Sequence, residues 1–448
     1  MNKLKLLWSD LRSSLWFLPL LIVAASVVLA VVLIEADSSV SDRWLARWPR
    51  LFGAGAAGAR GMLSTIAGAM MSVVGVTFSM TLVALSMASS QYTSRILRNF
   101  MSSRVTQAVL GVFAGIFTYC LIVLRTIRGG DEGAFVPNLA VFIGFVLAVG
   151  GVGVLILFIH HVASSIQASS IIASVADETI QAIDRLFPKQ LGHGPIEADD
   201  DPSPHPLTGR KWQFVASRES GYIQSVDSAA LLRLAREHKT VVRMERGIGE
   251  FVVQNTVLVS LALDAPPSPE TTAALQATFS FSRYRTLEQD AAFGIRQLVD
   301  IALKALSPGI NDTTTAVMCV DYLTAILARL APQLIPASNR YEDGELRVIA
   351  LGPSFQSLLS EAFDQIRESA KGNVAVMSRM LAALQTIASL TANPSRLQAL
   401  HEHVEWVAEL AQRTIESPHD RACFERRLGQ VREALCRLSE PIPPCFSD

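Results

Sequence analysis

The sequence predicts a membrane domain of four transmembrane α-helices followed by a cytoplasmic α+β domain with a small β module and a helical bundle. Long apolar runs fall almost entirely before residue 163 of the 448-residue chain. Strand-like alternation begins at Arg210, and the stretch 240–263 is expected to form two strands. From Pro353 onward apolar residues recur at helical spacing, with breaks near Gly372, Pro394 and Pro418. We therefore expect a transmembrane domain at 1–165, a helical extension and linker at 166–209, a β-rich module at 210–265 and a cytoplasmic helical domain at 266–448.

Four segments are long and apolar enough to cross a bilayer, which takes about 20 helical residues. The first is preceded by a basic start and lacks a convincing cleavage site, so we expect an uncleaved anchor. No Asp, Glu, Lys or Arg lies near the middle of any segment, which argues against a proton-coupled pump or an ion exchanger. The segments are 15–34, 61–88, 106–127 and 136–162.

The second segment carries small or hydroxylated residues along one face and continues as a polar extension to about Met101. Their spacing averages about 3.5 residues, which places them on one side of a helix, interrupted by Leu82. Such a face either lets another helix approach closely or lines a polar path when copies surround an axis. Both readings stay open for these residues: Thr65, Gly68, Ser72, Gly75, Ser79 and Ser86.

Orientation depends on Lys and Arg near the ends of the segments, and here the bias is mixed. Four spans place both termini on one side, and the large C-terminal part without paired cysteines suits the cytoplasm. Arg95, Arg98 and Arg104 would then lie at the inner mouth of a pore, where they would favour anions. Ordinary positive-inside anchoring explains the same three arginines equally well.

The most distinctive polar sequence of the C-terminal half lies within residues 270–330. A helix at about 287–306 ends at Ser307-Pro308-Gly309, and Asn311 or Asp312 can cap the next helix. The favoured interpretation is a rigid helical corner. The alternative is that five polar residues converge on a ligand or on the membrane-proximal mouth: Arg285, Glu288, Asp290, Asn311 and Asp312.

Several classes of function find no support. A net charge of −1 argues against a nucleic-acid binder. The chain has no P-loop, GxSxG, HExxH or Rossmann glycine pattern, so we expect neither an enzyme nor a cofactor. Its five cysteines form no CxxC pair. His401 and His403 are expected on a solvated helix face rather than at a metal site.

Two stretches of this chain, FSMTLVALSMASSQYTSRILRNFM at 78–101 and EQDAAFGIRQLVDIALKALSPGINDTTTA at 288–316, resemble a bacterial family of predicted membrane proteins, domain of unknown function 2254. The resemblance covers nearly the whole chain. It implies a bacterial inner-membrane location and a four-span N-terminal half, and it implies no known activity. The family pattern has proline after Asn-Asp where this chain has Thr313, a departure that should leave the fold unchanged.

The leading functional hypothesis is a passive ion channel formed by a symmetric homo-oligomer in the lipid bilayer, with the second span around the axis. The cytoplasmic domain would form a vestibule or gate. The competing hypothesis is a non-conducting scaffold or sensor whose cytoplasmic domain binds a partner or ligand. A membrane-bound enzyme is a third class, which would need convergent acid–base residues that the sequence does not show.

Overall fold

The chain forms two compact units, Met1–Ser170 and Ile171–Asp448. The computed structural model describes residues 16–39, 55–91, 104–128, 135–165, 167–186, 211–287, 289–336, 338–342 and 344–439. The interfacial helix that the sequence suggests near Trp44 and the polar extension at 92–101 lie outside these residues.

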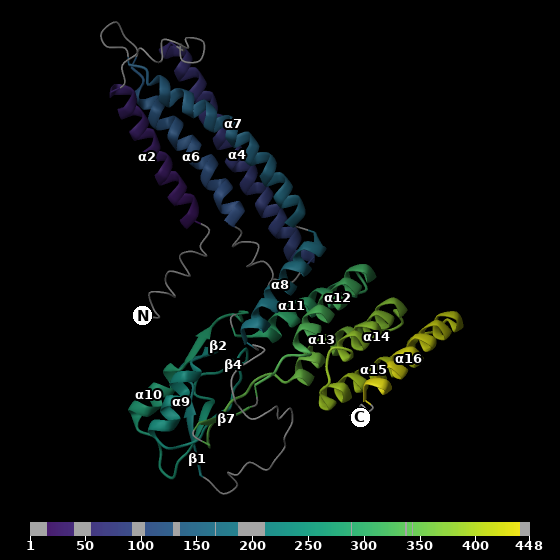
Figure 1. Ribbon diagram of the computed structural model, residues 1–448. Helices are drawn as coiled ribbons and strands as arrows, with labels where there is room; N and C mark the ends of the chain where they lie inside the picture. The colour runs from purple at the N-terminus through teal and green to yellow at the C-terminus, as the bar shows by residue number, and fades with distance from the viewer. Residues whose placement is uncertain are drawn as a thin grey trace, which may run out of the picture. The chain divides into compact units, whose positions relative to one another are not determined.

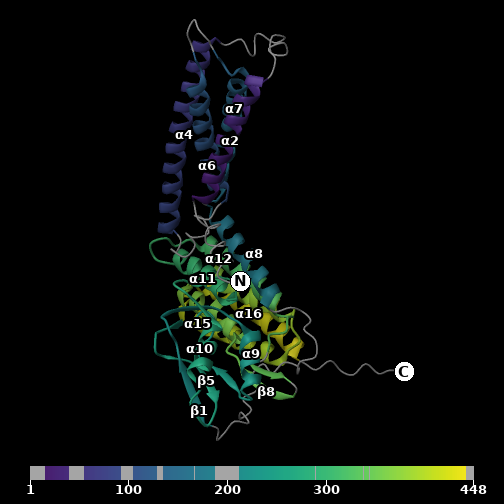
Figure 2. The same cartoon turned by 90° about the vertical axis from the view of Figure 1, so that its left-hand side faces the viewer.

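Four long apolar helices build the first unit (Figures 1 and 2). They coincide with the four predicted segments to within a few residues. The largest difference is at the second helix, which begins five residues earlier and continues to Gln91. The helices are α2 (Phe17–Ser39), α4 (Ala56–Gln91), α6 (Arg104–Thr126) and α7 (Asn138–Ser165).

Helix α6 lies at the centre of this bundle, in contact with the other three helices. Two glycines let α2 approach it closely. A methyl group at Gly111 would lie 2.8 Å from Ile22 Cδ1 and 2.9 Å from Pro19 Cα, and one at Gly115 would lie 2.5 Å from Ser26 Oγ. The Gly-x-x-x-Gly spacing in the sequence therefore marks a real helix–helix contact.

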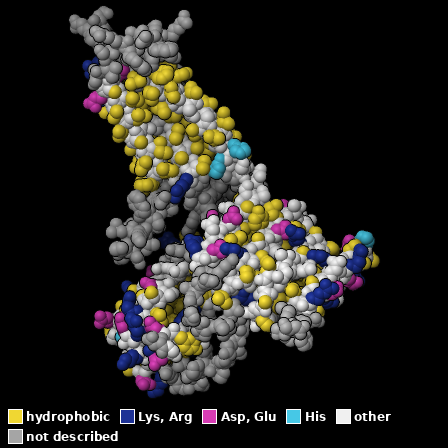
Figure 3. Space-filling model, in the orientation of Figure 1, with side chains coloured by type: hydrophobic (Ala, Val, Ile, Leu, Met, Phe, Trp, Pro, Cys, Tyr) yellow, Lys and Arg dark blue, Asp and Glu magenta, His cyan; other side chains and the backbone are white. Residues whose placement is uncertain are grey.

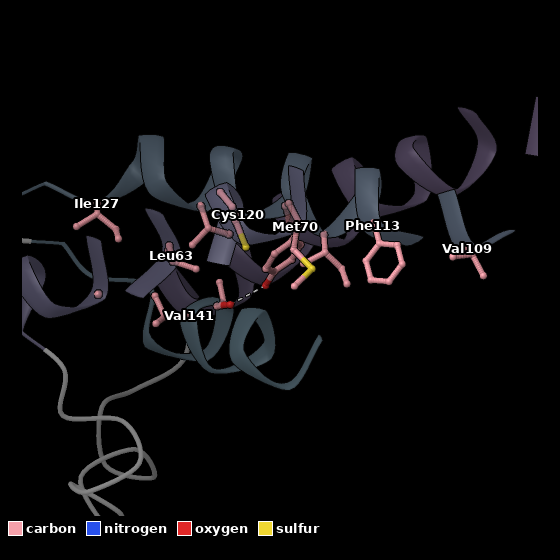
Figure 4. Packing of buried hydrophobic residues seen from close by; sticks show 14 of the residues in the cluster. Leu63, Met70, Val109, Phe113, Cys120, Ile127 and Val141 are labelled. Atoms are coloured by element: carbon pink, nitrogen blue, oxygen red, sulfur yellow. Dashed lines mark hydrogen bonds between the residues drawn. The ribbon is translucent and has the colours of Figure 1, made fainter. Parts of the chain in front are cut away.

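The core between α4, α6 and α7 is mostly apolar (Figure 4), and its buried polar groups include Thr77 of α4, Thr106 and Gln107 of α6, and the Tyr119 hydroxyl. Met70 of α4 lies beside Phe113 of α6, and Leu63 of α4 lies beside Tyr119 of α6. The Tyr119 hydroxyl donates to the Ala140 carbonyl at 2.7 Å. That bond satisfies the phenol in a setting where water is absent. The four helices of a single chain therefore pack around a core in which the Tyr119 hydroxyl is hydrogen-bonded.

Polar side chains fasten one end of the bundle. The Asp37 carboxylate at the end of α2 accepts from the Leu139 amide at 2.9 Å and so caps the start of α7. Arg60 Nη2 donates to the Ile127 carbonyl just past the end of α6 at 2.8 Å. These contacts satisfy backbone groups that a helix leaves unpaired at its termini.

The surface of the first unit is apolar, as Figure 3 shows for the face in view. Val28 of α2, Val76 of α4 and Leu157 of α7 are all more than half exposed. Length and hydropathy mark five helices among the described residues as able to cross a membrane: α2, α4, α6, α7 and, in the second unit, α12 (Thr313–Leu330).

The second unit combines two small sheets with helices. The five-stranded sheet has the order β1-β5-β3-β8-β7, in which only β3 and β8 run parallel, and the other sheet has the order β4-β2-β6. The strands are β1 (Trp212–Ala216), β2 (Gly221–Val226), β3 (Val242–Met244), β4 (Phe251–Val252), β5 (Val257–Ala262), β6 (Phe279–Ser282), β7 (Asn339–Glu342) and β8 (Glu345–Ile349).

Two expectations for this region need correction. The stretch from Thr240 to Leu263 forms three strands instead of two, because β4 and β5 join different sheets across a turn at Asn255 with φ +66°. The expected boundary at 265 does not separate sheet from helices. Strand β8, more than 80 residues further on, pairs with β3 inside the same sheet.

Local capping signals explain where the helices of the second unit begin. Asp227, Ser268, Ser354, Asn373 and Asn393 each accept a backbone amide at a helix start, and Pro269 and Pro394 occupy first-turn positions. The helices are α8 (Ala168–Leu186), α9 (Ser228–Glu237), α10 (Pro269–Ala277), α11 (Ala291–Ala305), α12, α13 (Phe355–Ser369), α14 (Val374–Ala388), α15 (Pro394–Thr414) and α16 (Pro418–Ser439).

Candidate functional site: the uncovered face of α4

All six residues of the predicted small and hydroxylated face are exposed on α4. The residues of α4 that are buried against the rest of the bundle are Ala59, Leu63, Ala67, Met70 and Thr77. At about 100° per residue, the two sets lie on nearly opposite sides of the helix. The polar face of α4 is therefore the face that its own bundle does not use.

The glycines of this face have no packing role within the described chain. A methyl group at Gly68 or Gly75 would find nothing within 4 Å, whereas one at Gly144 or Gly151 of α7 would press against neighbouring helices. Glycine costs a helix about 1 kcal/mol relative to alanine. Gly150 and Gly153 of α7 are equally open, so what distinguishes the two glycines of α4 is that they share a face with hydroxyl residues.

Two hydroxyls of this face already donate hydrogen bonds within their own helix. Thr65 Oγ1 donates to the Gly61 carbonyl at 2.8 Å, and Ser72 Oγ donates to the Gly68 carbonyl at 3.0 Å. Their oxygen lone pairs remain available to accept a bond or to coordinate a cation. From Thr65 to Ser86 the face extends about 32 Å at 1.5 Å per residue, close to the thickness of a hydrocarbon core.

Of the three arginines expected at an inner mouth, the structure describes only Arg104. It is exposed at the first position of α6. Arg95 and Arg98 lie outside the described residues.

The four described polar residues of the predicted set do not converge on one site. Arg285 binds Asp290 through two hydrogen bonds of 2.8 and 3.0 Å, and Asp290 also accepts the Phe293 amide to cap α11. Asn311 and Asp312 lie past the other end of this 15-residue helix, which is about 22 Å long. Glu288 lies outside the described residues.

Asn311 and Asp312 perform the predicted turn and cap. Asn311 takes a φ of +48°, and Asp312 accepts the Thr315 amide and hydroxyl at the start of α12. The bond from the Thr315 hydroxyl, followed by that from its amide, lowers the pKa of Asp312. Thr313 occupies the first helical position, which also suits proline, so the departure from the family pattern is conservative.

The sequence analysis expected His403 on a solvated helix face, but the residue is buried, with only 2% of its surface exposed. Its Nδ1 pairs with the Ala399 carbonyl at 2.8 Å, and its Nε2 lies 3.5 Å from Ser360 Oγ and 3.7 Å from Asp364 Oδ1. The helical spacing of α15 places this histidine against α13. No cluster of three or more His, Cys, Asp or Glu suited to a metal occurs among the described residues.

Because His403 is buried, we expect the second unit to lose stability in mild acid. Burial lowers its pKa below the ordinary 6.5, against weaker opposing effects from the Ala399 carbonyl and from Asp364. The unfolded chain therefore binds more protons, and the stabilisation falls as pH drops below about 6.5. We expect the melting temperature to fall from pH 7.5 to 5.5 more steeply in the wild type than in His403→Met. Equal slopes would contradict this assignment.

One family profile and several uncharacterized proteins match this chain. The profile of a family described as predicted membrane protein, domain of unknown function 2254, matches residues 12–386. An uncharacterized protein of Mycobacterium tuberculosis and one of Mycobacterium bovis are each 31% identical over 99% of this chain and 85% of their own length. No solved structure matches.

Proposed function

The chain belongs to the family of predicted membrane proteins named domain of unknown function 2254, and from the geometry of α4 we propose that it is a passive ion channel. In this proposal copies of the chain assemble symmetrically with the polar face of α4 around the axis. The observation that carries it is the uncovered face of α4: hydroxyls and unpacked glycines over the thickness of a bilayer, opposite the face packed on the bundle.

The proposal includes four membrane-spanning helices, with α12 excluded. The buried face of α12 packs on α11 and α14 within the second unit. Asp321, in the middle of α12, pairs with Arg379 of α14. A charged pair between the middle of α12 and α14 is expected in a water-exposed helical bundle, because charges are costly in the lipid interior.

The proposed location is the bacterial inner membrane, with both chain ends in the cytoplasm. An even number of alternating helices returns the chain to the side from which it started, so α2 begins and α7 ends on one side. The Arg104 end of α6 belongs to that same side. There its charge would raise the local concentration of anions at the mouth of the path.

One observation favours a second candidate, a non-conducting scaffold or sensor. The hydroxyls of Thr65 and Ser72 donate to their own helix, which makes the face suitable for dry packing against another helix. Such a protein would still self-associate through α4 but would pass no ions.

A single substitution separates the two candidates. We expect Ser72→Leu to reduce ion flux through proteoliposomes by about tenfold or more, because an apolar ring at a narrow point excludes water. Phe78→Leu is the matched control, since Phe78 is exposed on α4 to one side of the polar face, and it should conduct as the wild type does. Flux measured by a chloride- or potassium-sensitive dye checks this. If wild-type protein shown to be oligomeric passes no ions, the scaffold replaces the channel.

A further inference from the structure

A cavity of about 680 Å³ lies within the second unit. Helix α9, the first turn of α11 and the β7–β8 hairpin form its walls. Its size falls in the range of about 300–1,000 Å³ that is usual for small-molecule sites. It is independent of α4, and nothing below depends on whether the chain conducts ions.

Most of the wall is apolar. Leu231 of α9, Met244 of β3 and Val348 of β8 contribute buried side chains, and Ile248 and Ile335 add to them. Removing the apolar body of a ligand from water against such a wall is favourable for binding.

The carboxylates that line the cavity are already neutralised. Asp290 holds Arg285 and caps α11. Glu250 accepts the Gly247 amide at 2.9 Å and lies 3.6 Å from Arg246. Neither carboxylate offers an unbalanced negative charge to a ligand.

Arg340 is different, because none of the described residues forms an ion pair or a side-chain hydrogen bond with it. Two carboxylates of the hairpin are engaged by other arginines, Glu342 by Arg236 and Glu345 by Arg347, and the third, Asp343, lies outside the described residues. Partial burial of its guanidinium lowers the pKa of Arg340, although the residue as a whole remains exposed. Arg340 lies on the edge strand β7 and is exposed, so a ligand can reach it from solvent.

We propose that this cavity binds a small amphiphile with an apolar body and one carboxylate or phosphate group, which pairs with Arg340. A guanidinium presents a planar fork of donors that fits either oxyanion in a bidentate manner. The apolar wall takes the body, and the remaining polar groups of the lining set its orientation.

The test uses the full-length protein in nanodiscs, with empty nanodiscs as blank, and three probes of one shape: 2-naphthoate, 2-naphthyl phosphate and neutral 2-naphthamide. Equilibrium dialysis gives each dissociation constant. We expect at least one anion to bind better than the amide, and Arg340→Gln to weaken that anion about tenfold or more without changing the affinity for the amide. The better of the two anions identifies the head group.

Three further variants keep the result interpretable. Arg340→Lys should restore part of the affinity, because it retains the charge but loses the fork. Ala292→Trp, which fills the cavity from the first turn of α11, should abolish binding of the anion. Arg233→Gln, on the outer surface of α9, should leave it unchanged. The proposal is overturned if neither anion binds the wild type at millimolar concentration, or if folded Arg340→Gln binds the anion as well as the wild type does.

Discussion

Gly294→Ala should destabilise the second unit by about 1–3 kcal/mol, the usual cost of overpacking a filled core. Gly294 lies in α11 against Thr179 of α8, and both residues are buried. A methyl group at this glycine would overlap Thr179 Oγ1 and lie 2.8 Å from both its Cβ and its Cγ2. The Thr179 hydroxyl cannot easily turn away, because it donates to the Val175 carbonyl at 2.6 Å.

Chemical or thermal unfolding followed by circular dichroism checks this expectation. Gly429→Ala is the matched control, because a methyl group there meets nothing within 4 Å in helix α16. That change should be neutral or stabilise by up to about 1 kcal/mol. Adding Thr179→Ala to Gly294→Ala should recover part of the loss through a favourable coupling between neighbours. Unfolding of Gly294→Ala at the wild-type midpoint would show that α8 does not pack on α11 in this way.

Arg396→Met should cost about 3 kcal/mol or more, because it leaves buried carbonyls without a donor. Arg396 is 2% exposed in the first turn of α15. Its Nη1 donates to the carbonyls of Ala331 at 2.8 Å and Gln333 at 3.0 Å, just past the end of α12, and its guanidinium lies 5.1 Å from the centre of the Phe355 ring. One side chain thus joins α12, α13 and α15.

A surface arginine of the same helix provides the comparison. Arg413 pairs with Glu409 one turn earlier, and both side chains are more than half exposed, so Arg413→Met should change stability by less than about 0.5 kcal/mol. Arg396→Lys should lie between the two, because a single ammonium cannot reproduce the planar fork. If Arg396→Met unfolds like Arg413→Met, the carbonyls at the end of α12 are satisfied in another way.

Local chemistry predicted much of the fold. The apolar lengths of the membrane helices, the stop at Ser307-Pro308-Gly309 and the breaks at Gly372, Pro394 and Pro418 all depend on neighbours within a few residues. The capping of α12 by Asp312 also depends only on neighbouring residues, since its partner Thr315 is three positions away. Such signals can be seen in one stretch of sequence because the partner groups lie in that stretch.

Long-range pairing could not be predicted in this way. Nothing near Val242 indicates that it will pair with Val348, which also explains why the boundary at 265 failed. The same holds for Thr179 against Gly294 and for Arg396 at the end of α12, where each partner lies more than 60 residues away. Arg340 gave no signal either, because its importance depends on which neighbouring carboxylates are already paired.

The polar face of α4 is the intermediate case. Spacing alone predicted that its residues share one side of a helix, and the structure adds that the bundle leaves this side uncovered. Self-association through that side is required by the channel and by the scaffold alike. It is therefore the central feature to test.

The most direct measurement is photo-crosslinking between copies of the chain in native membranes. A benzophenone amino acid would replace Ser72 on the polar face or, as control, Met80, which is exposed about a quarter turn away on α4. We expect crosslinked dimers and higher oligomers of the chain from position 72 and few from position 80. Crosslinks from 80 but not from 72, or from neither, would contradict assembly through this face.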